Sequence, residues 1–234
     1  MHGTEPQRVG RDHVIAGQRH RQAHADRDAA HDRERLRYND GRCDRQGRFW
    51  IGQAQTRVGD GPNGQGALWR YDGHTLQPVV PDIGVANGIA FSADGRTMYY
   101  ADVLRSAVFV CDYDIETGMP GAAREFVRFP PGVVPDGATV DADGAYWIAL
   151  YRAGKLARYG TDGRLDREIA LPVSCPTMVA FGGDELDLLF VTSASHRLTA
   201  AERAAQPQAG GLFCCRPGVR GLPETRFRVR AEPL

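Results

Sequence analysis

Three polar side chains that carry oxygen atoms recur at equal intervals along the chain, at Asn39, Asn87 and Asp136. Each lies eight residues before the glycine of a similar turn motif, and each is followed by glycine at once or after one residue. Carboxylate and amide oxygens bind hard divalent cations such as calcium and magnesium, and manganese and zinc also accept them. The alternative is that Asn-Gly and Asp-Gly are only common turn dipeptides. The shared offset favours a cation site.

A positive charge accompanies the first of these side chains. Arg37 lies two residues before Asn39 and therefore projects from the same face of an extended strand. The equivalent positions of the later repeats hold Val85, Val134 and Cys175. A guanidinium at this place can hold the hydroxyl groups or the carboxylate of a small polar substrate. The simpler alternative is a solvated arginine at the edge of the preceding segment.

The equal spacing comes from a motif that is written several times. Its clear copies are residues 43–51, 91–100 and 140–148, and a looser fourth copy at 181–191 aligns Thr177 with the three polar positions. The turn glycines of the clear copies are 48 and 49 residues apart. Each copy is followed by another short apolar run, at 67–71, 107–111, 154–158 and 211–215. Several strands in each repeat of this length predict an all-β fold, a β-propeller with about four recognisable blades.

A propeller places the beginning of each innermost strand at the mouth of a central channel. The aligned side chains stand at this point of each repeat, so we expect them to meet around the channel. The turns themselves are expected to be plain hairpin turns in which glycine supplies a positive φ. Asp141-Ala-Asp143-Gly144 resembles a calcium loop only faintly, because the closing glutamate is absent.

Other candidate sites have weaker support. His20 and His24 are spaced to share a helix face, but no third ligand follows at a suitable distance. Ser195-His196 lacks the elbow of a nucleophilic serine, and His74 lies in a polar turn. The sequence contains neither a phosphate-binding loop nor a dinucleotide fingerprint.

Composition narrows the class of partner. The chain has 234 residues, with 29 Lys and Arg balancing 29 Asp and Glu. A neutral balance gives no electrostatic footprint for nucleic acid or an anionic membrane, so neither is an expected partner. No apolar stretch approaches the roughly 20 residues of a membrane span, and the N-terminus lacks the apolar region of a secretory signal peptide. The expected location is therefore the cytoplasm. The five cysteines form no CxxC pair, which favours reduced thiols.

The chain divides near residue 36. Residues 1–36 contain no aromatic residue and five of the seven histidines, so this segment is expected to be disordered or loosely helical. A second interpretation is that it derives from a wrong reading frame. Residues 37–234 form the predicted propeller domain, which holds about four repeats.

The repeats together resemble the family of senescence marker protein, regucalcin and gluconolactonase. The resemblance rests on Arg37-Tyr-Asn39-Asp-Gly through Trp50, on Asn87-Gly-Ile-Ala-Phe through Asp102, and on Pro135-Asp136-Gly with Val140-Asp-Ala-Asp-Gly. It implies a six-bladed propeller with one divalent cation at the channel mouth, held by a Glu, an Asn and an Asp, and the hydrolysis of sugar lactones.

Residue by residue, the resemblance implies that Asn87 and Asp136 bind the metal and that Arg37 and Asn39 contact the substrate. It also implies that Asp136 acts as a catalytic base towards water. Calcium or zinc is the expected cation, with magnesium and manganese as alternatives. The sequence departs from the family at the glutamate ligand, which Glu5 does not replace, and at a further acidic substrate contact, where Arg57 stands.

Two functions are therefore compatible with the sequence. The first is a divalent-metal-dependent hydrolase that opens a sugar lactone to its aldonic acid, an enzyme of the carboxylic ester hydrolase type. The second is a catalytically impaired, N-terminally incomplete propeller that only binds a metal or a partner. The oligomeric state is not specified by the sequence.

Overall fold

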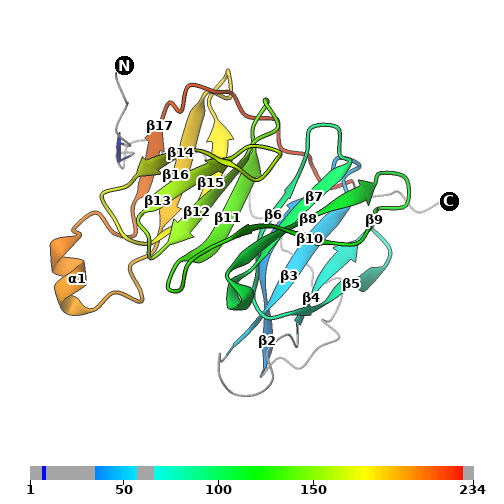
Figure 1. The fold of residues 1–234 in the computed structure, drawn as a ribbon, viewed down its shortest axis with the longest axis horizontal. Coiled ribbons are helices and arrows are strands. Elements are labelled where there is room, and N and C mark those ends of the chain that lie inside the picture. The colour runs from blue at the N-terminus through cyan, green and yellow to red at the C-terminus, as the bar shows by residue number, and fades with distance from the viewer. Residues whose placement is uncertain (1–6, 9–34, 57–65, 229–234) are drawn as a thin grey trace, which may run out of the picture.

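Short apolar runs separated by glycine-containing turns fold as four antiparallel sheets, the blades of a β-propeller (Figure 1). The computed structural model describes residues 7–8, 35–56 and 66–228. The predicted all-β propeller with four recognisable blades is confirmed. The strands expected at 67–71, 107–111, 154–158 and 211–215 are β4, β8, β13 and β17.

In each of the first three blades the strands run from the inner to the outer edge in the order of the sequence. Blade 1 contains β2 (Leu36–Cys43), β3 (Phe49–Gln55), β4 (Gly66–Tyr71) and β5 (Leu76–Ile83). Blade 2 contains β6 (Ala86–Phe91), β7 (Thr97–Asp102), β8 (Ala107–Asp114) and β10 (Arg124–Arg128), with β9 (Met119–Pro120) paired to β8. Blade 3 contains β11 (Val134–Val140), β12 (Tyr146–Tyr151), β13 (Lys155–Tyr159) and β14 (Leu165–Ala170).

Blade 4 is assembled from two distant parts of the chain. It contains β15 (Pro176–Gly182), β16 (Leu188–Ser193) and β17 (Leu212–Cys215), and β1 (Gln7–Arg8) pairs with β17 at its outer edge. The two helical segments of the described chain are a 3-10 turn (Val103–Arg105) and α1 (Ala200–Ala205). No helix in the described ranges is long and apolar enough to cross a membrane.

The inner strands β2, β6, β11 and β15 lie next to one another in this order. The hairpin turns that follow them confirm the role predicted for glycine, because Gly47, Gly95 and Gly144 have φ values of 84°, 71° and 86°. A residue with a side chain is strained in this left-handed region. The repeated turn therefore requires glycine for its backbone shape.

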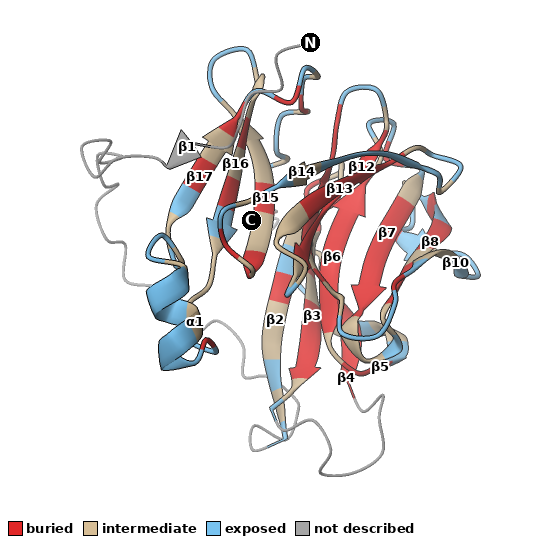
Figure 2. Cartoon of the chain, turned by 60° about the vertical axis from the view of Figure 1, so that its left-hand side comes forward, coloured by how far each residue is buried: buried red, intermediate tan, exposed pale blue. Residues whose placement is uncertain are grey.

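Apolar side chains between facing blades form the core. Figure 2 shows that buried residues are concentrated in the strands of the blades. Between blades 1 and 2 the cluster includes Trp50, Leu68 and Ile89. Between blades 3 and 4 it includes Trp147, Leu156 and Phe213, all fully buried. Because each sheet hides its faces against its neighbours, the blades stabilise one another.

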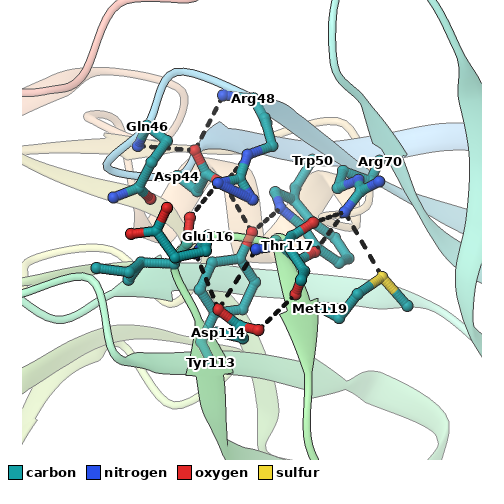
Figure 3. A network of polar contacts seen from close by, with 12 residues as sticks. Asp44, Gln46, Arg48, Trp50, Arg70, Tyr113, Asp114, Glu116, Thr117 and Met119 are labelled. Atoms are coloured by element: carbon teal, nitrogen blue, oxygen red, sulfur yellow. Dashed lines mark hydrogen bonds and ion pairs between the residues drawn. The ribbon is translucent and has the colours of Figure 1, made fainter.

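A buried carboxylate ties blade 1 to blade 2 (Figure 3). Asp44 is fully buried and accepts hydrogen bonds from the backbone N–H groups of Gln46 and Arg48, both at 2.9 Å. The hydroxyl of Tyr113 on β8 donates to Asp44 at 2.6 Å and accepts from the indole of Trp50 at 3.0 Å. Burial and the neighbouring carboxylate raise the pKa of Tyr113, so that its hydroxyl remains a donor.

The same position in blade 3 holds Asp141, which is also fully buried. Its carboxylate accepts from the backbone N–H groups of Asp143 and Ala145, from the Trp147 indole at 2.8 Å and from Arg158 Nε at 2.7 Å. One carboxylate thus fixes the turn, the core tryptophan and the next strand.

The C-terminal segment, residues 216–228, leaves β17 and crosses the turn end of the blades (Figure 1). It contacts blade 4 through Gly221 N to Leu186 O at 2.8 Å and blade 3 through Ala142 N to Arg220 O at 2.8 Å. It reaches blade 1 where Arg228 N donates to Gly47 O at 3.0 Å. This segment therefore links the last blade to the first.

Some predictions fall wholly or partly outside the described residues. Glu5, His20, His24 and Arg57 lie there, as does most of segment 1–36. Within that segment Gln7 and Arg8 form β1, a strand that the sequence did not predict. The five cysteines are free thiols, as expected. The start of β2 at Leu36 lies next to the predicted domain boundary.

Replacing Asp141 by Ala is expected to reduce the free energy of unfolding by about 3 kcal/mol, because it strands a buried guanidinium, an indole and two backbone donors. The matched control is Asp143→Ala, since Asp143 binds the same arginine from a side chain that is 66% exposed. Asp143→Ala should reduce the free energy of unfolding by less than about 1 kcal/mol. Urea unfolding of both variants measures the difference, and equal losses would contradict the assignment.

Candidate functional site

Every inner strand carries a β-bulge at or beside the position that the repeat alignment singled out. The register of β2 shifts between Tyr38 and Gly41, and that of β11 shifts between Pro135 and Ala138. In β6 the shift lies between Asn87 and Ala90, and in β15 it lies between Pro176 and Met178. A bulge bends the strand and re-aims its side chains. The irregularity is thus repeated where the predicted site lies.

Blades 1 and 2 meet at this level through a chain of side-chain hydrogen bonds. Arg37 Nη1 donates to Asn39 Oδ1 at 2.6 Å, and Asn39 Nδ2 donates to Asn87 Oδ1 at 2.6 Å. Asn39 Nδ2 also donates to the carbonyl oxygen of Ala86 at 2.8 Å. The guanidinium is exposed, whereas Asn87 is 7% exposed. The structure therefore joins three of the predicted site residues, one of them open to solvent.

Asp136 faces the same region from blade 3. An atom added at the Cβ position of Gly88 would lie 3.2 Å from the backbone oxygen of Asp136, so the two inner strands approach closely here. Burial, and next the charge of Asp40, raise the pKa of Asp136 to about 7, while the Gly137 N–H and the Arg37 charge oppose the rise. The charges of Asp40 and Arg37 therefore both act on the Asp136 carboxyl group.

Asp40 is a carboxylate of this site that the sequence analysis passed over. Its Oδ2 accepts the N–H of Ile89 at 2.9 Å, and the side chain is buried. Burial raises its pKa, although the Ile89 N–H and the Arg42 charge act in the opposite direction. Its place directly after Asn39 is visible in the sequence, whereas the bulge of β2 beside it is visible only in the structure.

The fourth blade contributes in a different way. The Thr177 hydroxyl shares a hydrogen bond of 2.8 Å with the hydroxyl of Thr192 on the neighbouring strand. Its backbone is nevertheless close to blade 3, because a Cβ at Gly137 would lie 2.8 Å from the Thr177 carbonyl oxygen. The hydroxyl of Thr177 is therefore used inside its own blade.

The donors present fit a hard cation, but as an incomplete set. Asn87 Oδ1 has a second lone pair beyond the one facing Asn39, and Asp136 supplies a carboxylate. Burial, and next the charge of Asp40, raise the pKa of Asp136, and a cation would compensate the negative charge of these two carboxylates. Among the described residues, no three His, Cys, Asp or Glu side chains form a group able to hold a metal. Asn87 and Asp136 therefore offer oxygen donors, and a cation held between them would need at least one more donor.

The weaker candidates His74 and Ser195 make contacts that hold the local backbone in place. The turn at His74 is held by Asp72, which accepts from the backbone N–H groups of His74 and Thr75 at 2.9 Å. The Ser195 backbone oxygen accepts from Arg203 at 3.0 Å next to α1. These contacts explain the residues as parts of a turn and a loop.

Comparison with known proteins matches the chain to one family. The model of the SMP-30/Gluconolactonase/LRE-like region matches residues 9–195. The chain is 41% identical over 199 residues to a 6-deoxy-6-sulfogluconolactonase of Pseudomonas putida, covering 83% of this chain and 66% of that protein. It is 37% identical to an L-arabinolactonase of Azospirillum brasilense, covering 82% of this chain and 63% of the relative.

Solved structures give the same result for the fold. A calcium-binding protein, regucalcin, from Agrobacterium tumefaciens superposes with a TM-score of 0.77 and 31% identity, over 82% of this chain and 65% of the other. The chain thus spans about two thirds of the length of the relatives that it matches.

The raised pKa of Asp136 makes the stability of the metal-free protein depend on pH. The folded state holds a proton that the unfolded state releases above its ordinary pKa of 3.8, so stability falls as pH rises from about 4 to about 7. Asp136→Asn removes this loss and should be more stable than the wild type at pH 8, by up to about 4 kcal/mol. At pH 3.5 the two should unfold alike.

Urea unfolding in the presence of a chelator, repeated at steps between pH 3.5 and 8, measures this difference. Curves that remain parallel across the range would show that the carboxyl group of Asp136 is not perturbed by its surroundings.

Proposed function

We propose, because the chain belongs to the SMP-30/Gluconolactonase/LRE-like family, that it forms part of a divalent-metal-dependent hydrolase that opens a sugar lactone to its aldonic acid. The observation that carries the proposal is the convergence of Arg37, Asn39, Asn87 and Asp136 from three blades. The names of two relatives, which denote lactonases, support the same reaction.

Asn87 and Asp136 are the residues that would hold the cation. We propose calcium or zinc, with magnesium or manganese as alternatives, since all accept oxygen donors. The name of the calcium-binding structural relative supports calcium. A bound cation supplies Lewis acidity towards the lactone carbonyl.

The chain's own groups bind the substrate and move a proton. Arg37 presents an exposed guanidinium, and Asn39 an amide, to the hydroxyl groups of the sugar. Asp136 takes a proton from the attacking water as the water oxygen adds to the carbonyl carbon. The ring C–O bond then breaks, and the proton passes to the departing ring oxygen. In the metal-free protein the pKa of Asp136 is raised to about 7. A cation beside it would favour the ionised carboxylate, which is the form that accepts the proton.

Arg37 also bears on the substrate class. An exposed guanidinium binds sulfonate and carboxylate groups as well as hydroxyls. The relative that is 41% identical is named for a lactone with a sulfo group. Lactones with an anionic substituent therefore belong beside neutral lactones in any substrate panel. We place the reaction in the cytoplasm, in keeping with five free thiols, with neither nucleic acid nor membrane as partner.

A second function stays open because one observation favours it. The described residues contain no group of three His, Cys, Asp or Glu side chains around the site. A catalytically impaired propeller that only binds a metal or a partner would need no complete ligand set.

Lactone hydrolysis, followed by acid release with gluconolactone, arabinolactone and 6-deoxy-6-sulfogluconolactone, tests the proposal. Activity should disappear with a chelator and return with calcium, zinc, magnesium or manganese. Asp136→Ala should lower kcat/KM by at least about 100-fold, since general bases contribute 10²–10⁴-fold. Asp143→Ala, at the turn end of blade 3, is the matched control and should retain activity.

One result would count against the enzyme and another against the role of Asp136. If the protein binds a cation but hydrolyses no lactone, the binding-only function is favoured. If Asp136→Ala and Asp143→Ala are equally active, Asp136 is not the base.

A further inference from the structure

The bulge of β6 frees backbone groups inside the protein. The register passes from the pair Asn87 and Ala101 to the pair Ala90 and Tyr99, so that Gly88 and Ile89 together face Tyr100. A bulged residue loses its regular ladder partner. Gly88 and Ile89 are nevertheless buried, and a buried N–H or C=O group requires a hydrogen bond.

The neighbouring blades supply these partners. The Asp40 carboxylate, from blade 1, accepts the Ile89 N–H at 2.9 Å. The Tyr146 hydroxyl, from blade 3, donates to the Gly88 carbonyl oxygen at 2.8 Å. Tyr146 is fully buried, and Asp40 is 9% exposed. We call these two contacts the bulge clamp.

Gly88 leaves room for the clamp. Its φ is +59°, and a Cβ there would lie 2.5 Å from the Tyr146 hydroxyl oxygen. Only glycine admits both this backbone shape and this approach. The bulge therefore requires glycine at position 88, and the absence of a side chain there lets the Tyr146 hydroxyl reach the backbone.

The clamp surrounds the side chain that the proposed site needs. Asn39 donates to Asn87 Oδ1 and to the Ala86 carbonyl oxygen, on one side of the bulge. Asp40 holds Ile89 on the other side. Blade 1 thus fixes the backbone before and after Asn87 with two consecutive residues.

We propose that Asp40 and Tyr146 are positioning residues that hold the β6 bulge and thereby orient Asn87 Oδ1 towards the cation. This inference rests on the proposed function for its purpose, while the clamp itself can be tested without a metal. Groups that orient a ligand from behind typically change metal affinity by 10–100-fold.

Tyr146→Phe is the principal variant, because it removes one hydroxyl and no charge. Tyr99→Phe is its matched control, since the Tyr99 ring stacks on the Tyr146 ring in the same core, with centroids 4.9 Å apart. In the described chain the Tyr99 hydroxyl makes no hydrogen bond to the bulge, and the backbone pairing of Tyr99 with Ala90 is not altered by the change. Asp40→Ala removes the acceptor for Ile89, whereas Asp40→Asn keeps an oxygen there. Both Asp40 variants test the other half of the clamp.

The first readout is hydrogen exchange of the Asn39 side-chain amide, measured by NMR on the metal-free full chain. We expect exchange at least about 10-fold faster in Tyr146→Phe and Asp40→Ala than in Tyr99→Phe and Asp40→Asn, because Asn87 Oδ1 is no longer held as acceptor. The second readout is calorimetric titration with calcium, zinc and manganese. The Kd should rise about 10-fold or more in Tyr146→Phe and stay unchanged in Tyr99→Phe.

Unchanged Asn39 exchange in Tyr146→Phe would overturn the proposal, and so would equal acceleration in Tyr99→Phe. Faster exchange with an unchanged Kd would show that the clamp does not serve a cation site, which also overturns it. If the wild type binds neither these three metals nor magnesium, the proposed metal dependence fails. The exchange comparison then still decides whether Asp40 and Tyr146 orient Asn87.

Discussion

A carboxylate buried between sheets must have its oxygens satisfied by hydrogen bonds, and this requirement organises the propeller. Asp44 and Asp141 stand at the same place in blades 1 and 3, and each gathers two turn N–H groups. Asp141 then binds its own tryptophan, whereas Asp44 reaches the tryptophan of its blade through Tyr113 of the next blade. The buried carboxylate therefore stabilises a single blade at Asp141 and the contact between two blades at Asp44. At both positions it fixes the hairpin turn and the core tryptophan together.

The site at the other end of the inner strands uses the backbone differently. There the strands depart from a regular ladder, and side chains from other blades complete the hydrogen bonding. Arg42 of blade 1 adds a further link, donating to the Ala138 carbonyl oxygen of blade 3 at 2.7 Å. Like charges at Asp40 and Asp136 are held near each other in this frame. Repulsion of this kind costs stability, and it persists in proteins where a site has a use for it.

Much of the fold could be predicted from the sequence because the repeated turn carries its own chemistry. Gly47, Gly95 and Gly144 mark a backbone shape that few other residues accept, and the equal spacing gave the blades. The same spacing located Asn39, Asn87 and Asp136, which the structure brings together; their chemical roles are still predictions.

Asp40 and Tyr146 were not found, because their role depends on which backbone groups a bulge leaves free. Aligning the repeats does not reveal which backbone groups are left free. It also does not reveal that the Thr177 hydroxyl is hydrogen-bonded to the Thr192 hydroxyl. The pairing of β1 with β17 joins residues from opposite ends of the chain and has no local signal.

The C-terminal segment changes the cooperativity of the molecule. A row of blades that touch only their neighbours behaves as a linear array, in which an end unit can open while the rest stays folded. The contact between Arg228 and Gly47, together with the stacking of Phe227 on Tyr71 at 5.5 Å, couples the two ends of this row. Fraying of blade 1 must then break contacts made by the last residues of the described chain. Because such a link closes a long loop, we expect it to form late in folding. The four blades then reach full stability only after Phe227 and Arg228 have docked on blade 1.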